Sequence, residues 1–161
     1  MTHGSRSGVS HFTAEDDEAA IQLARDLCDL LPANNMEKPP VKKTSDPISR
    51  SCDKLDVIIP EESNKPYDVV DVISEVLDDH GFLEVQADWA QNIVIGFGHL
   101  SGQTVGVVAN QPKILAGCLD IDASDKAARF VRFCDAFNVP IITFEDVPGF
   151  LPGTDQEWNA I

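Results

Sequence analysis

Residues Ala116 to Trp158 read AGCLDIDASDKAARFVRFCDAFNVPIITFEDVPGFLPGTDQEW and carry most of the architectural information in this chain. In order, they contain a small-residue turn at Ala116 to Cys118, an amphipathic helix, a β-branched strand and a loop rich in proline and glycine. A turn just before a helix presents backbone N–H groups and the positive end of the helix dipole. The stretch therefore predicts an anion-binding pocket built on an α/β framework.

The helix within this stretch is predicted to begin at Ser124 and Asp125, which supply a side-chain oxygen and a negative charge to unpaired amides. Apolar residues then recur at three- and four-residue steps, which places them on one face: Ala127, Phe130, Val131, Cys134 and Phe137. Three basic residues fall on another flank: Lys126, Arg129 and Arg132. We expect the apolar face to pack against another element.

A buried strand and a ligand-side loop follow the helix. Asn138 and Pro140 are predicted to end the helix, and Val139 to Phe144 is a short β-branched run typical of a buried strand. The loop Val147 to Thr154 comes directly after it, and ligands of layered α/β proteins usually bind at the carboxyl ends of strands. The preceding Glu145 and Asp146 are interpreted as structural anchors rather than as an acid–base pair.

The upstream part of the chain predicts a helix, a linker and a mixed α/β unit. A capping box at Thr13 to Asp16 starts a helix that Pro32 ends. Its predicted apolar face consists of Ala20, Ala24, Leu27, Cys28 and Leu31. Residues 33–51 carry proline, asparagine and lysine pairs without apolar periodicity, and they read as a linker. Val57 to Ile59 reads as buried.

The middle of the chain predicts one short helix and three extended segments. Val69 to Leu77 has helical apolar spacing, and Phe82 to Val85 looks extended. Two further strands, Ile93 to Phe97 and Val105 to Ala109, are predicted to form a hairpin through the turn His99 to Gln103. A hairpin that feeds a helix and then a strand is a mixed α/β layout.

Composition excludes several classes of protein. The chain has 161 residues, and its 12 basic against 27 acidic residues give a formal net charge of −15, which disfavours nucleic-acid binding. No stretch approaches eighteen apolar residues, so no membrane span is expected. The four cysteines lack metal-ligand spacing and predict free thiols, no metal site and a cytoplasmic location. No serine lies in a nucleophile elbow, which argues against a serine hydrolase.

Five segments together resemble the carboxyltransferase subunit of biotin-dependent acyl-CoA carboxylases, of the propionyl-CoA carboxylase β chain and methylmalonyl-CoA decarboxylase α chain type. They are SGVSHF (Ser7 to Phe12), YDVVDVI (Tyr67 to Ile73), VGVVANQP (Val105 to Pro112), LDIDASDKAARFVRFCDAFN (Leu119 to Asn138) and DVPGFLPGTDQE (Asp146 to Glu157). The resemblance covers essentially the whole chain.

The resemblance implies a crotonase-like α/β fold, the ββα superhelix, in a chain that is an internal fragment of a longer subunit. Residues 1–32 would end the N-terminal carboxyltransferase half, residues 33–55 would link the halves, and residues 56–161 would begin the C-terminal half. The implied activity moves CO2 from carboxybiotin to the α-carbon of a short acyl-CoA, propionyl-CoA first among them. Biotin would arrive on a separate carrier. Like subunits would assemble as a hexamer with a biotin carboxylase and carrier subunit as further partners.

The same resemblance suggests where substrates would bind. The turn resembles the Ala-Gly-x-Asp turn of crotonases, so the backbone amides of Gly117 and Cys118 are the predicted oxyanion donors. A substrate or biotin pocket would be lined by Leu119, Asp120, Pro148, Gly149, Phe150 and Gly153. The CoA side would involve His3, Ser7, Gly8, Lys126 and Arg129. The resemblance also implies that two oxyanion-stabilising elements of the family lie outside this chain: a Gly-Gly pair just upstream and a glycine-rich turn downstream.

Alternatives remain open at each of these points. The basic helix flank with Lys126, Arg129 and Arg132 is either a CoA phosphate contact or a solvated surface, and Phe150 either covers a ligand or packs in the core. His11 reads as a packing or turn residue. At the level of function, the rivals are a non-catalytic chain that only binds other subunits and a crotonase-superfamily hydrolase or isomerase acting on acyl-CoA.

Overall fold

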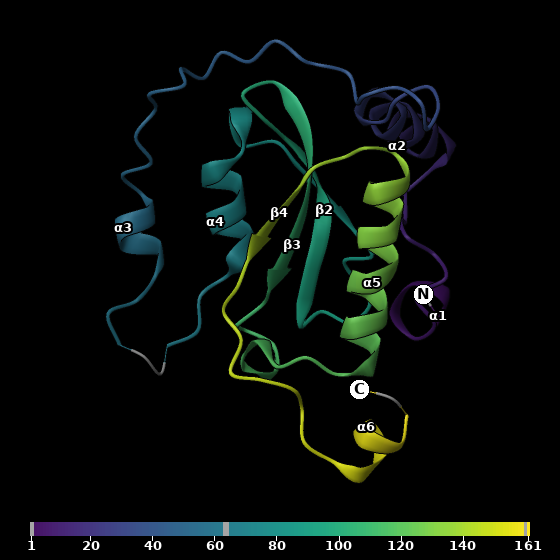
Figure 1. The fold of residues 1–161 in the computed structure, drawn as a ribbon, viewed down its shortest axis with the longest axis vertical. Helices are drawn as coiled ribbons and strands as arrows, with labels where there is room; N and C mark the ends of the chain where they lie inside the picture. The colour runs from purple at the N-terminus through teal and green to yellow at the C-terminus, as the bar shows by residue number, and fades with distance from the viewer. Residues whose placement is uncertain (1, 63–64, 160) are drawn as a thin grey trace.

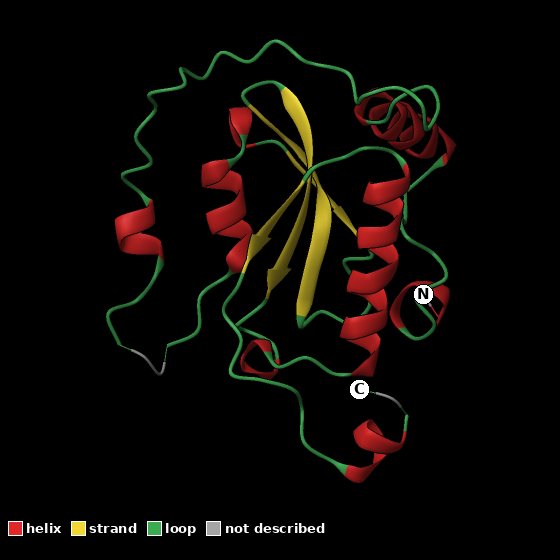
Figure 2. Ribbon diagram, in the orientation of Figure 1, coloured by secondary structure: helices red, strands yellow, loops and turns green. Residues whose placement is uncertain are grey.

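A four-stranded sheet lies between two helices in the computed structural model, which describes residues 2–62, 65–159 and 161 (Figure 1, Figure 2). The strands are β1 (Phe82–Val85), β2 (Ile93–Leu100), β3 (Gln103–Asn110) and β4 (Ile141–Phe144), and their order in the sheet follows their order in the chain. The first three strands pair antiparallel, whereas β4 runs parallel to β3. The mixed α/β layout predicted from the sequence is thus confirmed.

The β2–β3 hairpin is longer than predicted, because its turn needs only two residues. Ser101 and Gly102 adopt φ values of 52° and 78°, the left-handed pair that suits a tight hairpin. The buried carboxylate of Asp78 accepts hydrogen bonds from both of their amides, at 3.0 and 2.6 Å. The ladder therefore extends from Ile93 paired with Asn110 to Leu100 paired with Gln103.

Helix α5 (Ile121–Ala136) covers one face of the sheet. Its residues Ala123, Phe130 and Cys134 are buried in a cluster with side chains of β1, β2 and β3. The ring centroids of Phe97 and Phe130 lie 5.0 Å apart. The predicted apolar face is correct for Phe130 and Cys134 but wrong for Val131, which is exposed. Asn138, at φ 57°, takes the left-handed conformation that commonly follows a helix end, as predicted.

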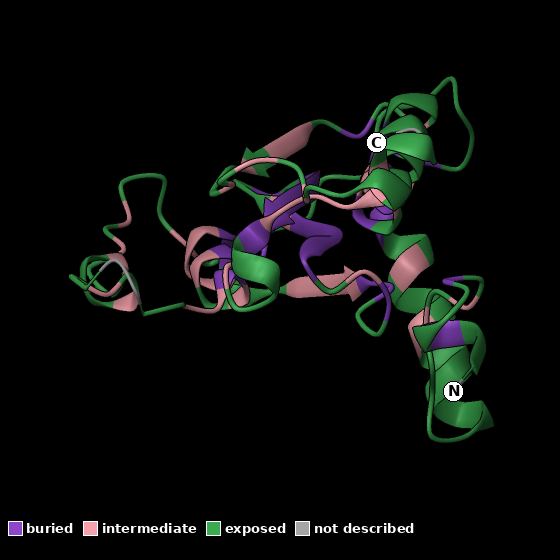
Figure 3. Ribbon diagram, turned by 90° about the horizontal axis from the view of Figure 1, so that it is seen from below, coloured by how far each residue is buried: buried purple, intermediate pink, exposed green. Residues whose placement is uncertain are grey.

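Helix α4 (Val69–Val76), the short helix predicted from its apolar spacing, covers the other face of the sheet. Ile73 and Leu77 are fully buried against Val94, Val105, Val107 and Ala109 of the two central strands. The guanidinium of Arg50 donates to the carbonyls of Glu75, Val76 and Leu77 and so satisfies the carboxyl end of the helix. Strands β2 and β3 are therefore buried on both faces, which Figure 3 shows as purple at the centre of the molecule.

The N-terminal region packs more loosely. Helix α1 (Thr2–Ser5) is short, and α2 (Asp17–Leu30) is capped by the side chain of Asp16, not by Thr13 as predicted. Leu30 is the buried residue of α2, whereas the predicted face with Ala20, Ala24 and Cys28 is exposed. Val57 in α3 (Leu55–Ile58) is 79 % exposed, so the expectation that Val57 to Ile59 is buried was wrong. The division at residues 32 and 55 stays a prediction.

Three short elements complete the structure: the 3-10 turns η1 (Asp78–His80) and η2 (Leu115–Gly117), and the C-terminal helix α6 (Thr154–Trp158). Among the described residues, no helix has both the length and the apolar composition that crossing a bilayer requires.

Candidate functional site

Two parallel strands end at the same edge of the sheet, and the predicted ligand-side segments meet there. Strands β3 and β4 end at Asn110 and Phe144, so the segments that follow them start side by side. Helix α5 begins at the same edge, directly after η2 (Figure 1). The carboxyl edge of parallel strands next to a helix N-terminus is a frequent ligand site in α/β proteins.

The structure joins the predicted turn to the predicted loop by backbone hydrogen bonds. The amide of Leu119 donates to the carbonyl of Gly149 at 3.1 Å, and the amide of Leu151 donates to the carbonyl of Leu119 at 2.7 Å. Leu119 and Phe150 thereby form a parallel bridge. We call the residues Gly117–Asp120 and Pro148–Gly153 the strand-edge site. Phe150 is 64 % exposed there, so the core-packing alternative for its ring is wrong.

Two asparagine side chains hold the turn of the strand-edge site. Asn110 at the end of β3 donates to the carbonyl of Gly117 at 3.1 Å. Asn92, just before β2, donates to the carbonyl of Cys118 at 2.8 Å and to the carboxylate of Asp120 at 3.1 Å. Both asparagines are buried. Sequence reasoning missed both, although a polar residue at the end of a β-branched strand was a usable signal for Asn110.

Gly117 sits in a backbone conformation and a space that suit glycine. Its φ is 78°, and a Cβ placed there would lie 2.6 Å from the carbonyl oxygen of Asp146. The amide of Gly117 donates to the carbonyl of Ile114 at 2.9 Å, and that of Cys118 donates to Leu115 at 3.0 Å. Both predicted oxyanion donors already have acceptors within the turn, so their role toward a substrate oxygen stays a prediction.

Asp120 caps helix α5, which corrects the predicted start at Ser124 and Asp125. Its carboxylate accepts from the amide of Ala123 at 2.9 Å, and its extended backbone is that of an N-cap residue. The helix therefore begins four residues earlier than Asp125, directly against the strand-edge site. Asp120 is thus a structural cap whose side chain also joins α5 to Asn92.

A tyrosine hydroxyl anchors the segment that follows β4. Tyr67 donates to the carboxylate of Asp146 at 2.8 Å. Burial and this hydrogen bond raise the pKa of Tyr67 to about 12, so the phenol remains a donor at neutral pH. The pair lines an open depression of about 500 Å³ that Pro112 and Ala116 also line, next to the turn. The interpretation of Asp146 as a structural anchor agrees with this contact.

The prediction that Lys126 belongs to a basic flank of the helix is wrong, because its side chain is completely buried. Its ammonium group donates to the backbone carbonyls of four residues at 2.7 to 3.3 Å: Gln86, Trp89, Ala90 and Ile93. Burial lowers the pKa of Lys126 to about 8, and the carboxylate of Glu84 opposes this shift. Lys126 is therefore neither solvated nor directed at a CoA phosphate, whereas Arg129 is exposed.

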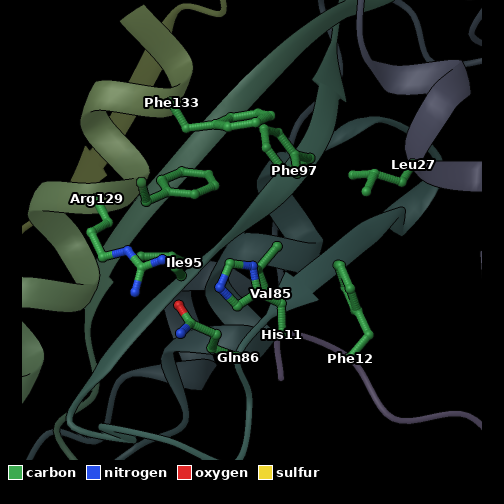
Figure 4. A pocket seen from close by; sticks show the side chains of 10 residues that line it. His11, Phe12, Leu27, Val85, Gln86, Ile95, Phe97, Arg129 and Phe133 are labelled. Carbon is green, nitrogen blue, oxygen red and sulfur yellow. The ribbon is translucent and has the colours of Figure 1, made fainter. Parts of the chain in front are cut away.

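An apolar cavity of about 200 Å³ lies between α5 and the N-terminal segment (Figure 4). Its apolar lining consists of Val85, Ile95, Phe97, Phe130 and Phe133 from β1, β2 and α5, together with Phe12 and Leu27. Arg129, His11 and Gln86 bring their polar groups together at one side in Figure 4. Partial burial and the nearby guanidinium of Arg129 lower the pKa of His11, but the residue as a whole is exposed, so its interpretation as a packing or turn residue stays a prediction.

The other predicted CoA-side residues lie along the N-terminal segment. His3 and Ser7 are exposed, and Ser7 donates to the carbonyl of His3 at 3.3 Å. Gly8 is buried against the indole of Trp89, and its carbonyl accepts from the side chain of Gln86 at 2.6 Å. The contacts of this segment therefore run to the loop before β2. In residues 2–62, 65–159 and 161, no three His, Cys, Asp or Glu side chains group as metal ligands would.

Comparison with known proteins identifies the family. The model of the carboxyl transferase domain matches residues 1–161. The chain is 55 % identical over 99 % of its length to a propionyl-CoA carboxylase carboxyltransferase subunit of Haloferax mediterranei and 53 % identical over its full length to a methylmalonyl-CoA decarboxylase subunit alpha of Veillonella parvula. It covers 31 % and 32 % of those two proteins, so it spans about a third of their length.

A solved structure agrees with this result. The chain superposes with a TM-score of 0.93 and 47 % identity on a transcarboxylase 12S crystal structure, described as a hexamer with hydrolysed methylmalonyl-coenzyme A bound. The match covers 99 % of this chain and 31 % of that one. The predicted α/β carboxyltransferase fold of crotonase type is confirmed. The chain belongs to the carboxyl transferase domain family.

Proposed function

We propose that this chain contributes to a carboxyltransferase that moves a carboxyl group from carboxybiotin to the α-carbon of a short acyl-CoA, with propionyl-CoA as substrate and methylmalonyl-CoA as product. The observation that carries the proposal is the identity of more than half of the residues, over 99 % or more of the chain, to proteins named for propionyl-CoA and methylmalonyl-CoA. The structural neighbour described with hydrolysed methylmalonyl-coenzyme A bound supports the same substrate class.

The reaction needs electrostatic stabilisation more than it needs a titratable base. Removal of the α-proton places negative charge on the thioester oxygen, and backbone N–H groups aimed at that position stabilise it by about 3 kcal/mol each, judging from deleted oxyanion donors. The strand-edge site lies at the N-terminus of α5, where the helix dipole also favours negative charge. Asn92 and Asn110 would keep its turn rigid through the contacts described above.

We propose that the loop of the strand-edge site binds a flat, partly apolar ligand such as the biotin ring. A Cβ built at Gly149 would meet nothing within 4 Å, and the Phe150 ring is mostly exposed beside it. When bound, biotin supplies the carboxyl group as a carbamate on its ureido ring. In the proposal, Phe150 stacks on this ring or on the acyl chain, while Leu119, Asp120, Pro148 and Gly153 shape the cleft around it.

The proposed assembly follows from the same relatives. Like subunits would form a hexamer, as in the transcarboxylase 12S structure, and a biotin carboxylase with a carrier domain would deliver the carboxyl group. Both the carrier partner and a cytoplasmic location are part of this proposal.

The test is an acyl-CoA panel assayed with the full-length gene product. The protein is incubated with biotin carboxylase, biotinylated carrier, ATP and labelled bicarbonate, and acetyl-, propionyl- and butyryl-CoA are compared. We expect labelled methylmalonyl-CoA to form fastest. Phe150→Ala should lower kcat/KM at least ten-fold, whereas Met36→Ala, at an 87 % exposed site near the start of the linker, should leave it unchanged. Acyl-CoA hydrolysis without any carboxylation would overturn the proposal.

A further inference from the structure

We propose that Lys126 is a positioning residue. Through one loop, residues 86–93, it fixes two parts of the proposed substrate site: the N-terminal segment with the CoA-side residues and the strand-edge site. The inference rests on the proposed function for its kinetic consequence, but its structural consequence can be measured without any activity. The four carbonyls that accept from Lys126, those of Gln86, Trp89, Ala90 and Ile93, are called the carbonyl cage below.

The carbonyl cage holds the loop at several points at once. The ammonium nitrogen lies 2.7 Å from the Trp89 oxygen, 2.8 Å from that of Ile93, 3.0 Å from that of Gln86 and 3.3 Å from that of Ala90. An ammonium group has three N–H donors, so the cage offers more acceptors than donors and each donor is engaged. Among the described residues, no carboxylate lies within ion-pair distance of Lys126, so its direct partners are carbonyl groups, while the more distant carboxylate of Glu84 also favours the buried charge.

One end of the loop holds the N-terminal segment. The amide of Gln86 donates to the carbonyl of His11 at 2.9 Å, and its side chain donates to the carbonyl of Gly8 at 2.6 Å. The indole of Trp89 lies directly against Gly8, leaving no room for a Cβ. These contacts place the segment that carries the proposed CoA-side residues His3, Ser7 and Gly8.

The other end of the loop holds the strand-edge site. Asn92 donates to the carbonyl of Cys118 and to the Asp120 carboxylate, as described above. The carbonyl of Asn92 also accepts from the amide of Gln111 at 3.0 Å, which ties the loop to the end of β3. A side chain from the middle of α5 therefore fixes a loop whose two ends reach two separate parts of the proposed site.

A purely structural lysine and a positioning lysine predict different results. Loss of a structural lysine lowers the free energy of unfolding without a specific effect on substrate. Loss of a positioning lysine loosens residues 8–11 and 117–120 together and weakens use of the acyl-CoA. Because the ammonium group is the part that binds the cage, an added alkylammonium ion should restore both properties to a variant that lacks it.

The experiment compares Lys126→Ala with the wild type in the full-length gene product. Hydrogen exchange of residues 8–11 and 117–120 and kcat/KM for the acyl-CoA are measured with n-butylammonium or with tetramethylammonium at equal ionic strength. We expect exchange in both segments to rise at least ten-fold and kcat/KM to fall at least ten-fold. n-Butylammonium should restore both several-fold, whereas tetramethylammonium, which has no N–H donor, should not. Lys54→Ala, at a side chain 70 % exposed, is the matched control and should match the wild type.

Two further variants keep the inference testable if Lys126→Ala does not fold. Gln86→Ala should loosen residues 8–11 alone, because it removes the side-chain hydrogen bond to Gly8. Asn92→Ala should loosen residues 117–120 alone, because it removes the hydrogen bonds to Cys118 and Asp120. The inference is overturned if folded Lys126→Ala exchanges like the wild type, or if each single branch variant loosens both segments equally. A wild type without carboxylation overturns the proposed function instead, and the exchange pattern still decides the role of Lys126.

Discussion

Gly117 and Asp146 meet where the segments after two parallel strands converge, and this contact leaves room for no side chain. Gly117→Ala would combine an unfavourable φ of 78° with a Cβ 2.6 Å from the Asp146 oxygen. We expect the substitution to lower the free energy of unfolding by about 1–3 kcal/mol. Chemical denaturation of the purified chain measures this loss.

Gly149→Ala is the matched comparison for this substitution. Gly149 has a φ of 147°, but a Cβ there meets nothing within 4 Å. It therefore carries a backbone cost without a clash, and a φ of 147° is less accessible to an L-residue than 78°. A loss at Gly117 that equals or exceeds the loss at Gly149 would show that the contact with Asp146 adds to the destabilisation, and a clearly smaller loss would contradict it.

The raised pKa of Tyr67 predicts that the free energy of unfolding changes in alkaline solution. Its pKa is about 12 in the folded chain against an ordinary value of 10.0. Between these values the folded state retains a proton that the unfolded state has lost, so the contribution of Tyr67 is complete below pH 10 and disappears as pH rises through 12. The free energy of unfolding should therefore fall more steeply between pH 10 and 12 in the wild type than in Tyr67→Phe. Parallel profiles for the two proteins would contradict this assignment.

At the scale of elements, the start of α5 is the sharpest test of the structure. Asp120→Ala should lower the free energy of unfolding by about 1 kcal/mol, because the amide of Ala123 loses its acceptor. Asp120→Asn should retain most of the stability, since an asparagine oxygen can also cap. Asp125→Ala changes an exposed residue inside the helix and should stay within about 0.5 kcal/mol of the wild type. Thermal and urea unfolding distinguish the two positions, and a larger loss at Asp125 would restore the sequence-based helix start.

Elements with a strong local signal could be predicted from the sequence. The helix at Val69–Val76 and the strands from Ile93 and Val105 follow from short-range apolar spacing, and all three are present. Local patterns failed where several residues fit the same role and only a tertiary contact distinguishes them. Asp120, Ser124 and Asp125 can all cap a helix, and only Asp120 also meets Asn92. Val57 is apolar in sequence, but no packed element covers it.

The candidate site was predictable in its segments and not in its long-range partners. The proline-glycine loop was placed at the strand edge from its position directly after a strand, whereas the turn was assigned to the site from its resemblance to the crotonase turn. Lys126 was misplaced because its carbonyl acceptors lie 33 to 40 residues away along the chain, where no periodicity can reveal them. The acceptors are backbone groups, so they also leave no residue-type signature. The hydrogen bond from Tyr67 to Asp146 spans 79 residues of sequence, so local patterns could not predict it either.

At the scale of the whole molecule, an acidic surface coexists with exposed apolar side chains. Ile21 on α2 is 55 % exposed, Val131 on α5 is 42 % exposed and Trp158 on α6 is 80 % exposed. The formal net charge of −15 makes copies of the chain repel one another at low ionic strength. Apolar attraction and charge repulsion thus oppose each other, and salt weakens only the second.

This balance predicts that the 161-residue chain associates with itself and that association increases with salt. Size-exclusion chromatography with light scattering should show a larger mean mass in 0.5 M than in 0.02 M sodium chloride, because the Debye length shrinks from about 20 Å to about 4 Å. Ile21→Lys combined with Val131→Lys should reduce the mass at high salt, since both substitutions charge the uncovered helix faces. Ile48→Lys, at a 94 % exposed loop position, adds one positive charge without altering either helix and serves as control. A chain that stays monomeric at both salt concentrations would mean that these helix faces do not drive association, whatever their exposure.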